Sequence, residues 1–161
     1  PEGWDNQLDN EVIVNMSYVD YFRAYMNDYI NWVTYYGADL GTLHINGSMG
    51  TTIKFGWNVS KDYDFTKIEP LPRAKGAKSY RLYGILGCEG TWVLYNALID
   101  GSMFNDGHSI KSKEYLGEFF TGVTIETHNI ELTTMYTIRS QEFYWQEHPS
   151  KFGAVSVAYK W

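Results

Sequence analysis

The most constraining feature of this chain is the strict alternation of side chains along its last seven residues. The apolar set is Val155, Val157, Tyr159 and Trp161, and the small or polar set is Ser156, Ala158 and Lys160. Alternation with a period of two predicts a half-buried strand. An aromatic last residue is typical of the strand that closes a bacterial outer-membrane barrel, where the ring lies in the interfacial girdle. The pattern therefore predicts that a bilayer surrounds part of the protein.

The composition agrees with this prediction. Phe, Trp and Tyr supply 28 of the 161 residues, and Tyr alone supplies 14; rings with a polar tip are favoured at membrane–water interfaces. The mean hydropathy is −0.36 and no apolar run approaches about 18 residues, which excludes a transmembrane helix. A barrel is not excluded, because the apolar and polar residues that alternate along its strands cancel in the mean hydropathy. The net charge of −6 argues against a nucleic-acid partner, and the single Cys88 excludes an internal disulfide.

Alternation elsewhere in the chain predicts seven strands in all and no helix. The predicted strands are 12–25, 30–40, 48–57, 80–98, 115–127, 130–139 and 155–161. Loops are expected at 58–78, 99–114 and 141–151, with tight turns near Asn27-Asp28, Gly41 and His128-Asn129. Glycines inside the long fourth strand, at Gly84, Gly87 and Gly90, predict a bend or bulge there.

The polar faces of these strands carry a nearly balanced set of charges. The acidic members are Asp39, Glu89, Glu118, Glu126 and Glu131, and the basic members are Lys54, Arg81, Arg139 and Lys160. Such a set predicts a barrel interior filled by a charge network rather than a wide aqueous pore. A soluble sandwich with these charges facing water fits the alternation equally well and stays the alternative.

Seven strands conflict with a closed single-chain bacterial barrel, which has an even number. An open sheet would also leave two unpaired edges in lipid. We therefore expect residues 1–161 to form a single β-barrel domain truncated at its N-terminus, in line with an opening at Pro1 rather than Met. If the C-terminus is periplasmic, the turn near 41–44, the loops at 99–114 and 141–151 and the segment before Val12 face outside.

Two of these outward segments are rich in chemistry-bearing side chains. Residues 3–11 offer carboxylates and amides that suit Ca²⁺ or could orient a general base or an oxyanion; the alternative is a solvated loop. Residues 100–109 place a histidine beside two aspartates and two serines, as in hydrolases; the alternative is a surface turn. His44, His128 and His148 fall in turns or loops and are not expected to act in a site.

Several short motifs are spread along the whole chain. They are Gly3-Trp4-Asp5-Asn6-Gln7-Leu8 with Asn10-Glu11; Gly37-Ala38-Asp39-Leu40-Gly41; Phe55-Gly56-Trp57-Asn58; Ile99-Asp100-Gly101 with Phe104, Asp106, His108 and Ser109; Arg139-Ser140-Gln141-Glu142-Phe143; and Phe152-Gly153 through Trp161. Together these motifs resemble the LpxR type of outer-membrane lipid A 3′-O-deacylases. The resemblance covers essentially the entire chain.

This resemblance implies an all-β fold, a transmembrane antiparallel barrel of twelve strands, of which the seven here would be the sixth to the twelfth. The implied site faces outward, between the barrel wall and a short helix in an extracellular loop. The implied reaction is hydrolysis of the ester that links the 3′ acyloxyacyl chain of lipid A, with calcium as the cofactor. The implied setting is the bacterial outer membrane, with lipopolysaccharide as partner and a monomer as the full-length form.

The candidate catalytic residues are Glu11, Asp5, Gln7 and His108, and the candidate substrate-binding residues are Trp4, Asn6 and Asp106. No metal ligand is assigned. His108 does not match the family's catalytic histidine, which falls just before the Gly-Trp motif, and the family's Asn-Asp pair and early hydroxyl residue have no counterpart. The chain alone is therefore expected to be inactive. A non-catalytic outer-membrane barrel and a soluble lipid-binding barrel remain the alternative functions.

Overall fold

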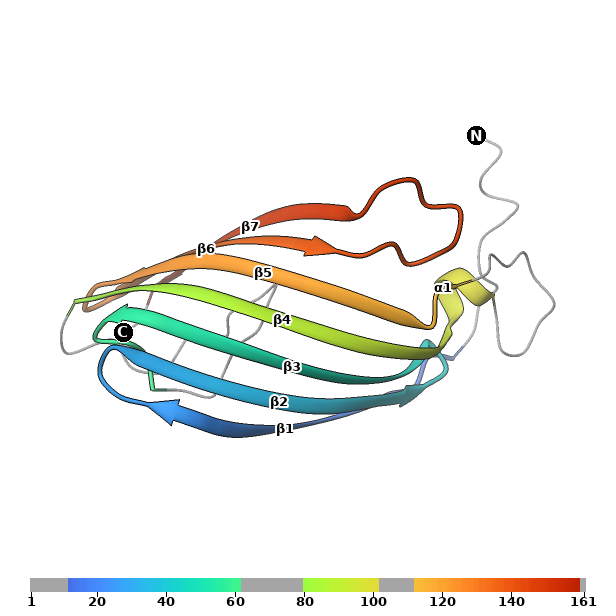
Figure 1. Cartoon of the computed structure of the whole chain (residues 1–161), viewed down its shortest axis with the longest axis horizontal. Coiled ribbons are helices and arrows are strands. Elements are labelled where there is room, and N and C mark those ends of the chain that lie inside the picture. The colour runs from blue at the N-terminus through green and yellow to red at the C-terminus, as the bar shows by residue number, and fades with distance from the viewer. Residues whose placement is uncertain (1–11, 62–79, 102–111, 160–161) are drawn as a thin grey trace.

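The computed structural model describes residues 12–61, 80–101 and 112–159, which form seven strands and one short helix (Figure 1). The elements are β1 (Asn15–Met26), β2 (Ile30–Gly41), β3 (His44–Trp57), β4 (Arg81–Asn96), α1 (Ala97–Asp100), β5 (Tyr115–Glu126), β6 (Ile130–Arg139) and β7 (Ser150–Tyr159). The strands pair antiparallel in chain order from β1 to β7 within one sheet. The prediction of seven strands is confirmed.

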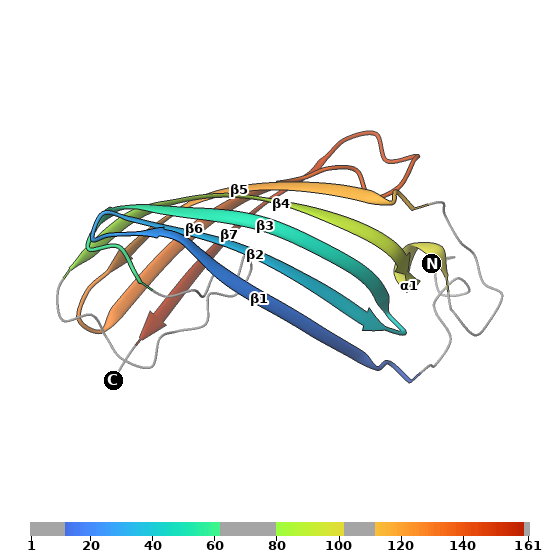
Figure 2. The same ribbon diagram turned by 60° about the horizontal axis from the view of Figure 1, so that its bottom comes forward.

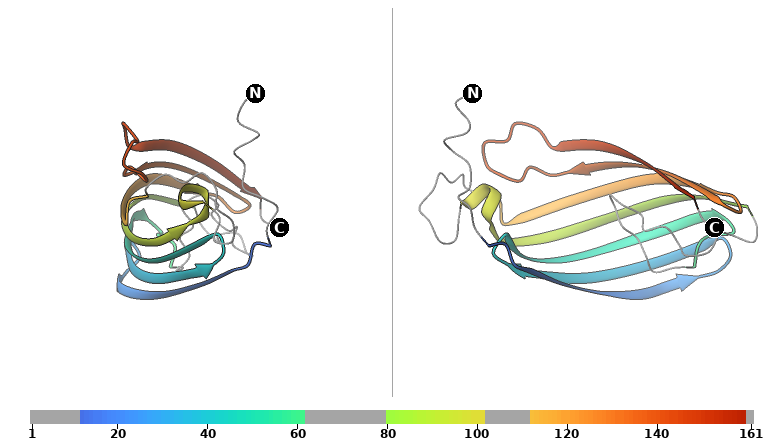
Figure 3. Two further views of the ribbon diagram at one scale, coloured as in Figure 1. Left: turned by 90° about the vertical axis from the view of Figure 1, so that its right-hand side faces the viewer. Right: turned by 180° about the vertical axis from the view of Figure 1, so that it is seen from behind.

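The sheet is a single curved layer (Figure 2). Viewed along the strands, it bends into an open trough in which β1 and β7 are the two edges (Figure 3). The described residues form no second sheet that could pack against the first, so the two-sheet sandwich is wrong. The trough has the form of an incomplete barrel wall.

Four predicted boundaries were wrong by two or more residues, the first being the start of β1, which lies at Asn15 rather than at 12. β3 begins at His44 rather than at 48 and β7 begins at Ser150 rather than at 155, because pairing with the neighbouring strand continues past the apolar pattern. Asp39 pairs with Asn46, and Arg139 pairs with Ser150. The added residues, 44–47 and 150–154, do not continue the apolar alternation; Lys151 and Gly153, for example, lie on the same face as Val155. A hydrophobic pattern therefore does not detect these extensions.

The fourth wrong boundary is the end of β4, where a one-turn helix, α1, replaces the strand predicted to reach residue 98. The Oδ1 atom of Asn96 accepts a hydrogen bond from Leu98 N at 3.1 Å. Asp100 Oδ2 accepts one from Asn96 N at 2.9 Å, so two side chains cap the turn. Gly101 ends the turn with a φ of 85°. In the described residues, no helix is long and apolar enough to span a membrane.

The convex face of the trough is apolar and exposed. Its side chains include Trp32, Met49, Leu82, Leu86, Trp92, Phe119, Val123, Ile125, Val155 and Val157, each at least 40 % exposed. Tyr80 and Trp92 lie twelve positions apart on this face, about 40 Å of strand at ~3.3 Å per residue. With a tilt of ~45° that span crosses about 28 Å, close to the ~25 Å apolar band of an outer-membrane barrel. The terminal residues 160–161, including Lys160 and Trp161, lie outside the described part.

The concave face carries the buried residues. Phe120, Tyr83, Ile85, Met135 and Val59 form an apolar cluster, to which the segment after β3 contributes because it turns back under the sheet. Asn31 Nδ2 donates to Ser60 O at 2.8 Å, and Val59 N donates to Asp28 O at 3.0 Å. This segment fills the trough at the end where the β1–β2 and β5–β6 turns lie.

The predicted charge network also lies on the concave face. Arg81 Nη1 is 2.9 Å from Glu126 Oε2, and the Glu126 side chain is fully buried. Lys54 and Glu131 are 4 % and 7 % exposed. A buried carboxylate is stable only when an opposite charge or a hydrogen-bond donor lies close to it. The nearly equal numbers of acidic and basic interior residues in the sequence are therefore explained by ion pairs on the concave face, such as Arg81 with Glu126.

β4 does contain a bulge, but at Leu94, where Ile45 pairs with Tyr95 and Asn46 with Val93. The predicted position at the glycines is wrong, because pairing with β3 and β5 runs without a register shift through Gly84, Gly87 and Gly90. Two of these glycines make room for rings instead. A Cβ at Gly84 would meet Phe55 Cζ at 2.7 Å, and one at Gly87 would overlap the Phe120 ring. Nothing lies within 4 Å of a Cβ built at Gly90.

We predict that Gly87→Ala destabilises the full-length protein by about 1–3 kcal/mol, because the added Cβ would displace the Phe120 ring and lie 2.9 Å from the Thr51 carbonyl oxygen. Gly90→Ala is the matched control, and it should be neutral or slightly stabilising because the position is open. Guanidinium unfolding in lipid vesicles measures both variants. Equal destabilisation by the two would contradict the packing described for Phe120.

Candidate functional site

A polar hollow of about 410 Å³ lies on the concave face at the α1 end of the sheet. Side chains from β3, β4, β5 and β6 line it together with the residues that flank α1. The lining residues are Leu43, His44, Asn46, Glu89, Thr91, Val93, Asn96, Leu98, Leu116, Glu118, Arg139 and Glu142. The hollow is the main candidate site within the described residues, because it gathers ionisable groups from several strands in a concave position.

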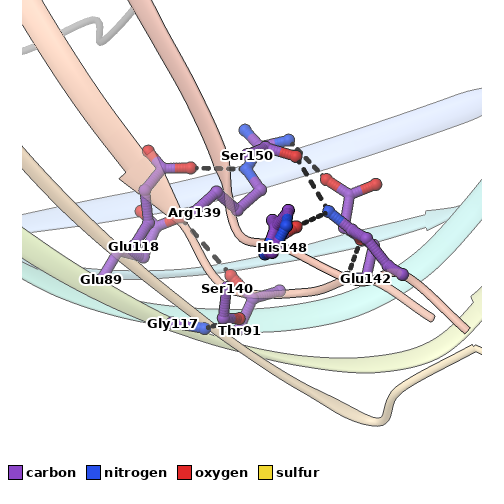
Figure 4. Close-up of polar contacts among 10 residues, drawn as sticks. Glu89, Thr91, Gly117, Glu118, Arg139, Ser140, Glu142, His148 and Ser150 are labelled. Carbon is purple, nitrogen blue, oxygen red and sulfur yellow. Dashed lines mark hydrogen bonds and ion pairs between the residues drawn. The ribbon is translucent and has the colours of Figure 1, made fainter. Parts of the chain in front are cut away.

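Arg139 is the central cation of this hollow (Figure 4). Its Nε donates to Glu118 Oε2 at 2.7 Å, and its Nη1 donates to Glu142 Oε1 at 3.0 Å. The guanidinium carbon also lies 5.7 Å from the centroid of the Phe152 ring. Glu118 is 8 % exposed, so its pairing with Arg139 occurs largely out of water. Arg139 therefore joins β5, β6 and the segment after β6.

Glu89 lies next to Glu118 because the two residues are paired across β4 and β5. Glu89 Oε2 accepts a hydrogen bond from the Tyr35 hydroxyl at 2.7 Å, and its Oε1 accepts one from Thr91 Oγ1 at 3.4 Å. Carboxylates placed directly opposite each other repel, and the neighbouring Arg139 offsets this repulsion. With Glu142, the hollow holds three carboxylates against one guanidinium.

The segment after β6 forms the rim of the hollow through a set of internal hydrogen bonds. Glu142 N donates to Gln146 Oε1 at 2.8 Å, and Gln146 Nε2 donates to His148 O at 2.8 Å and to Ser150 Oγ at 3.2 Å. Lys113 Nζ donates to Gln141 Oε1 at 2.6 Å and ties the rim to the start of β5. The motif Arg139–Phe143 thus contributes both the cation of the site and its rim.

The turn between β2 and β3 brings two distant parts of the chain together at this end. On one side, Thr42 N donates to Val14 O at 2.9 Å and Val14 N donates to Thr42 Oγ1 at 3.1 Å. On the other side, Ala97 N at the start of α1 donates to Leu43 O at 2.8 Å. Residues 12–14 and α1 therefore flank one turn, so the segments at 1–11 and 102–111 attach at the same end, as predicted from parity.

The predicted site residues themselves lie outside the described ranges. Asp5, Gln7, Glu11, Trp4 and Asn6 fall in 1–11, and Asp106 and His108 fall in 102–111. Within residues 12–61, 80–101 and 112–159, no group of three or more His, Cys, Asp or Glu side chains could hold a metal ion. The carboxylates around Arg139 therefore do not fit a calcium site by themselves, and the calcium requirement stays a prediction that rests on the family resemblance.

Sequence reasoning missed three parts of the site. His44 lines the hollow, with its Nε2 atom 3.8 Å from Asp39 Oδ2, although it was not expected to act in a site. Glu142 was not counted among the interior charges because it follows the last residue of β6. The helix α1 was also missed; the signal for it is the pair Asn96 and Asp100, which can cap one turn.

Comparisons with known proteins agree with the fold. The sequence model of the family described as "Outer membrane protein LpxR" matches residues 1–161. The structure is similar to LpxR from Salmonella typhimurium, with a TM-score of 0.75 and 13 % sequence identity. The match covers 98 % of this chain and 55 % of that chain, so this chain spans about half the length of that protein. No curated protein sequence matches.

We predict that Arg139→Met destabilises the full-length protein by about 1–3 kcal/mol, because it leaves the mostly buried Glu118 without its guanidinium partner. Adding Glu118→Gln to Arg139→Met should recover part of this loss, so the double variant should cost less than the two single variants together. Denaturant unfolding in vesicles measures the cycle, with Lys151→Met on the convex face as the control. If the free-energy changes of the two single variants add up to that of the double variant, the coupling between Arg139 and Glu118 is contradicted.

Proposed function

The chain belongs to the LpxR family of outer membrane proteins, and on that premise we propose that it forms part of the wall and rim of a lipid A 3′-O-deacylase. The family match over residues 1–161 carries the proposal. It is supported by the polar hollow at the α1 end, because a site for an amphipathic lipid needs polar groups beside an apolar wall. The protein is located in the outer membrane, and lipopolysaccharide is the proposed substrate-bearing partner.

The height of the hollow relative to the membrane interface supports hydrolysis of a lipid A ester. Trp92 lies near the α1 end of β4 and is 50 % exposed on the convex face, as expected for a ring in an interfacial belt. Glu89, three positions earlier, lines the hollow on the opposite face. An ester at the level of the outer-leaflet interface would therefore lie at the height where the wall carries its ionisable groups.

Ester hydrolysis needs a base to deprotonate water and donors or a cation to stabilise the oxyanion. We assign the base to one of Asp5, Glu11 or His108, with Gln7 as an oxyanion donor, and Trp4, Asn6 and Asp106 to substrate contact. Calcium, held by residues 3–11, would supply positive charge. The described residues have a positioning role: Arg139, Glu118 and Glu142 fix the rim. The turn at Thr42 holds Val12 and Val14, which directly follow the 3–11 segment.

We further propose that additional strands of the same chain, upstream of Pro1, close the barrel as a monomer. Among the described residues, β1 and β7 each pair with a strand on one side, which supports this proposal because backbone groups facing hydrocarbon must find partners. The gene sequence upstream of Pro1 is the test. We expect further alternating segments there, whereas a signal peptide ending directly before Pro1 would contradict the proposal.

The reaction is tested with the full-length protein and purified lipid A. We expect mass spectrometry to detect loss of the mass of one acyloxyacyl chain. A chelator should abolish this loss, calcium should restore it, and magnesium should not, because the carboxylates and amides proposed for the site suit the larger cation. Absence of any mass loss with calcium present would exclude the deacylase and favour a transport or structural barrel.

Variants locate the base within the same assay. Asp5→Asn, Glu11→Gln and His108→Ala are compared, and we expect the one that removes the base to lower the rate by about 10²–10⁴-fold. Glu2→Gln, outside the 3–11 segment, is the matched control and should stay within about twofold. If all three variants keep full activity, the assignment of the base is wrong even if the reaction is confirmed.

A further inference from the structure

A second hollow, of about 750 Å³, lies on the convex face. Its lining includes residues from two neighbouring paired rows: Tyr36, Met49, Gly90 and Gly117 in one row, and Gly47, Trp92 and Tyr115 in the next. The first row has large side chains on β2 and β3 and glycines on β4 and β5. The second row has a glycine on β3 and aromatic rings on β4 and β5. The hollow is therefore a groove that runs obliquely across β2 to β5, below the Trp92 and Tyr115 rings.

The floor of the groove is open because of two glycines at positions where the packing of neighbouring residues leaves room for a side chain. Nothing lies within 4 Å of a Cβ built at Gly90 or at Gly117, and these two residues are direct partners across β4 and β5. In contrast, Gly84 and Gly87 of the same strand make room for neighbouring rings. Glycine inside a strand costs stability relative to alanine and is found where a ligand approaches the backbone closely.

The walls of the groove are flat and apolar. The Trp92 and Tyr115 rings are stacked with their planes 8° apart and their centroids 6.4 Å apart. Met49 and Tyr36 form the opposite wall and are 66 % and 40 % exposed. Ser140 is the polar side chain at the border, and its Oγ already accepts a hydrogen bond from Gly117 N at 2.9 Å (Figure 4). The groove therefore suits a hydrocarbon chain better than a polar group.

We propose that this groove binds one acyl chain of lipid A; this proposal rests on the proposed function and extends it to the substrate's hydrocarbon part. The groove is continuous with the apolar surface that faces the bilayer, so lipid chains surround it. It lies at the α1 end, which parity places in the outer leaflet, where lipid A is the proposed substrate. Thr91 and Leu116 line both this groove and the polar hollow, so the two lie back to back across the same stretch of wall.

The test uses the full-length protein in phosphatidylethanolamine–phosphatidylglycerol vesicles with two probes, lipid A carrying a spin-labelled acyl chain and a phospholipid carrying the same label. We expect electron paramagnetic resonance to detect a motionally restricted fraction of lipid A. Gly117→Leu, which fills the groove, should reduce that association about tenfold. Thr121→Leu, four positions along the same face of β5, is the matched control and should leave the fraction unchanged.

Trp92→Ala, which removes one wall, is a second variant in case Gly117→Leu does not fold, and it should weaken the lipid A association severalfold. Equal restriction of the labelled phospholipid, or unchanged restriction of lipid A in both folded variants, would overturn the proposal. A cross-linked dimer that forms in the wild type and is lost in Gly117→Leu, without restricted lipid A, would show a second copy as the occupant and would also overturn it.

Kinetics separate this proposal from the proposed function. If both hold, Gly117→Leu should raise KM about tenfold with little change in kcat, because it removes binding shared by the ground and transition states. Motional restriction of lipid A without any deacylation would refute the proposed function but would still support acyl-chain binding in the groove. Deacylation with an unchanged KM in Gly117→Leu would refute the groove and leave the function standing.

Discussion

Every backbone N–H and C=O group that faces hydrocarbon must be paired within the protein, and the rest of this structure depends on that requirement. Between the two edge strands, the chain meets it with a continuous antiparallel ladder from β1 to β7 in which each strand pairs with its sequence neighbours. Because the ladder fixes the register, each strand presents one set of side chains to lipid and the other to the concave face. Trp32 and Asn31 illustrate the result: the first is 42 % exposed and the second is fully buried.

This requirement also explains which features could be predicted from the sequence. The two-residue period identifies a strand and assigns its faces, as for Trp92 outside and Glu89 inside. It fails where the residues are small or polar on both faces, as at Asn46 and Gly47, because pairing with β2 and β4 rather than burial determines the start of β3 there. The helix α1 depends on hydrogen bonds from Asn96 and Asp100, and a hydrophobic pattern carries no signal for a cap.

Two charges of the polar hollow were predictable as interior residues but their pairing was not, and the site residues predicted in 3–11 and 102–111 stay a prediction. The sequence indicated that Glu118 and Arg139 would both face the interior, and the register then places them directly opposite each other. Glu142 completes the arrangement only because the chain turns after β6, and that turn is held by Gln146. Loop geometry of this kind follows from specific hydrogen bonds rather than from periodicity, which is why sequence reasoning missed Glu142 and also set aside His44.

The wall itself connects the two hollows at the α1 end. Consecutive residues of a strand point to opposite faces, so Glu118 lines the polar hollow while Gly117 lies on the floor of the apolar groove. The same relation holds on β4, where Gly90 lies between Glu89 and Thr91. Because the two environments lie on the two sides of a thin wall near its rim, a substrate with a polar head and a hydrocarbon tail could contact both at one height. A single curved layer of strands provides this arrangement, whereas a protein with a conventional two-layer core would separate the two surfaces by at least the ~10 Å between packed sheets.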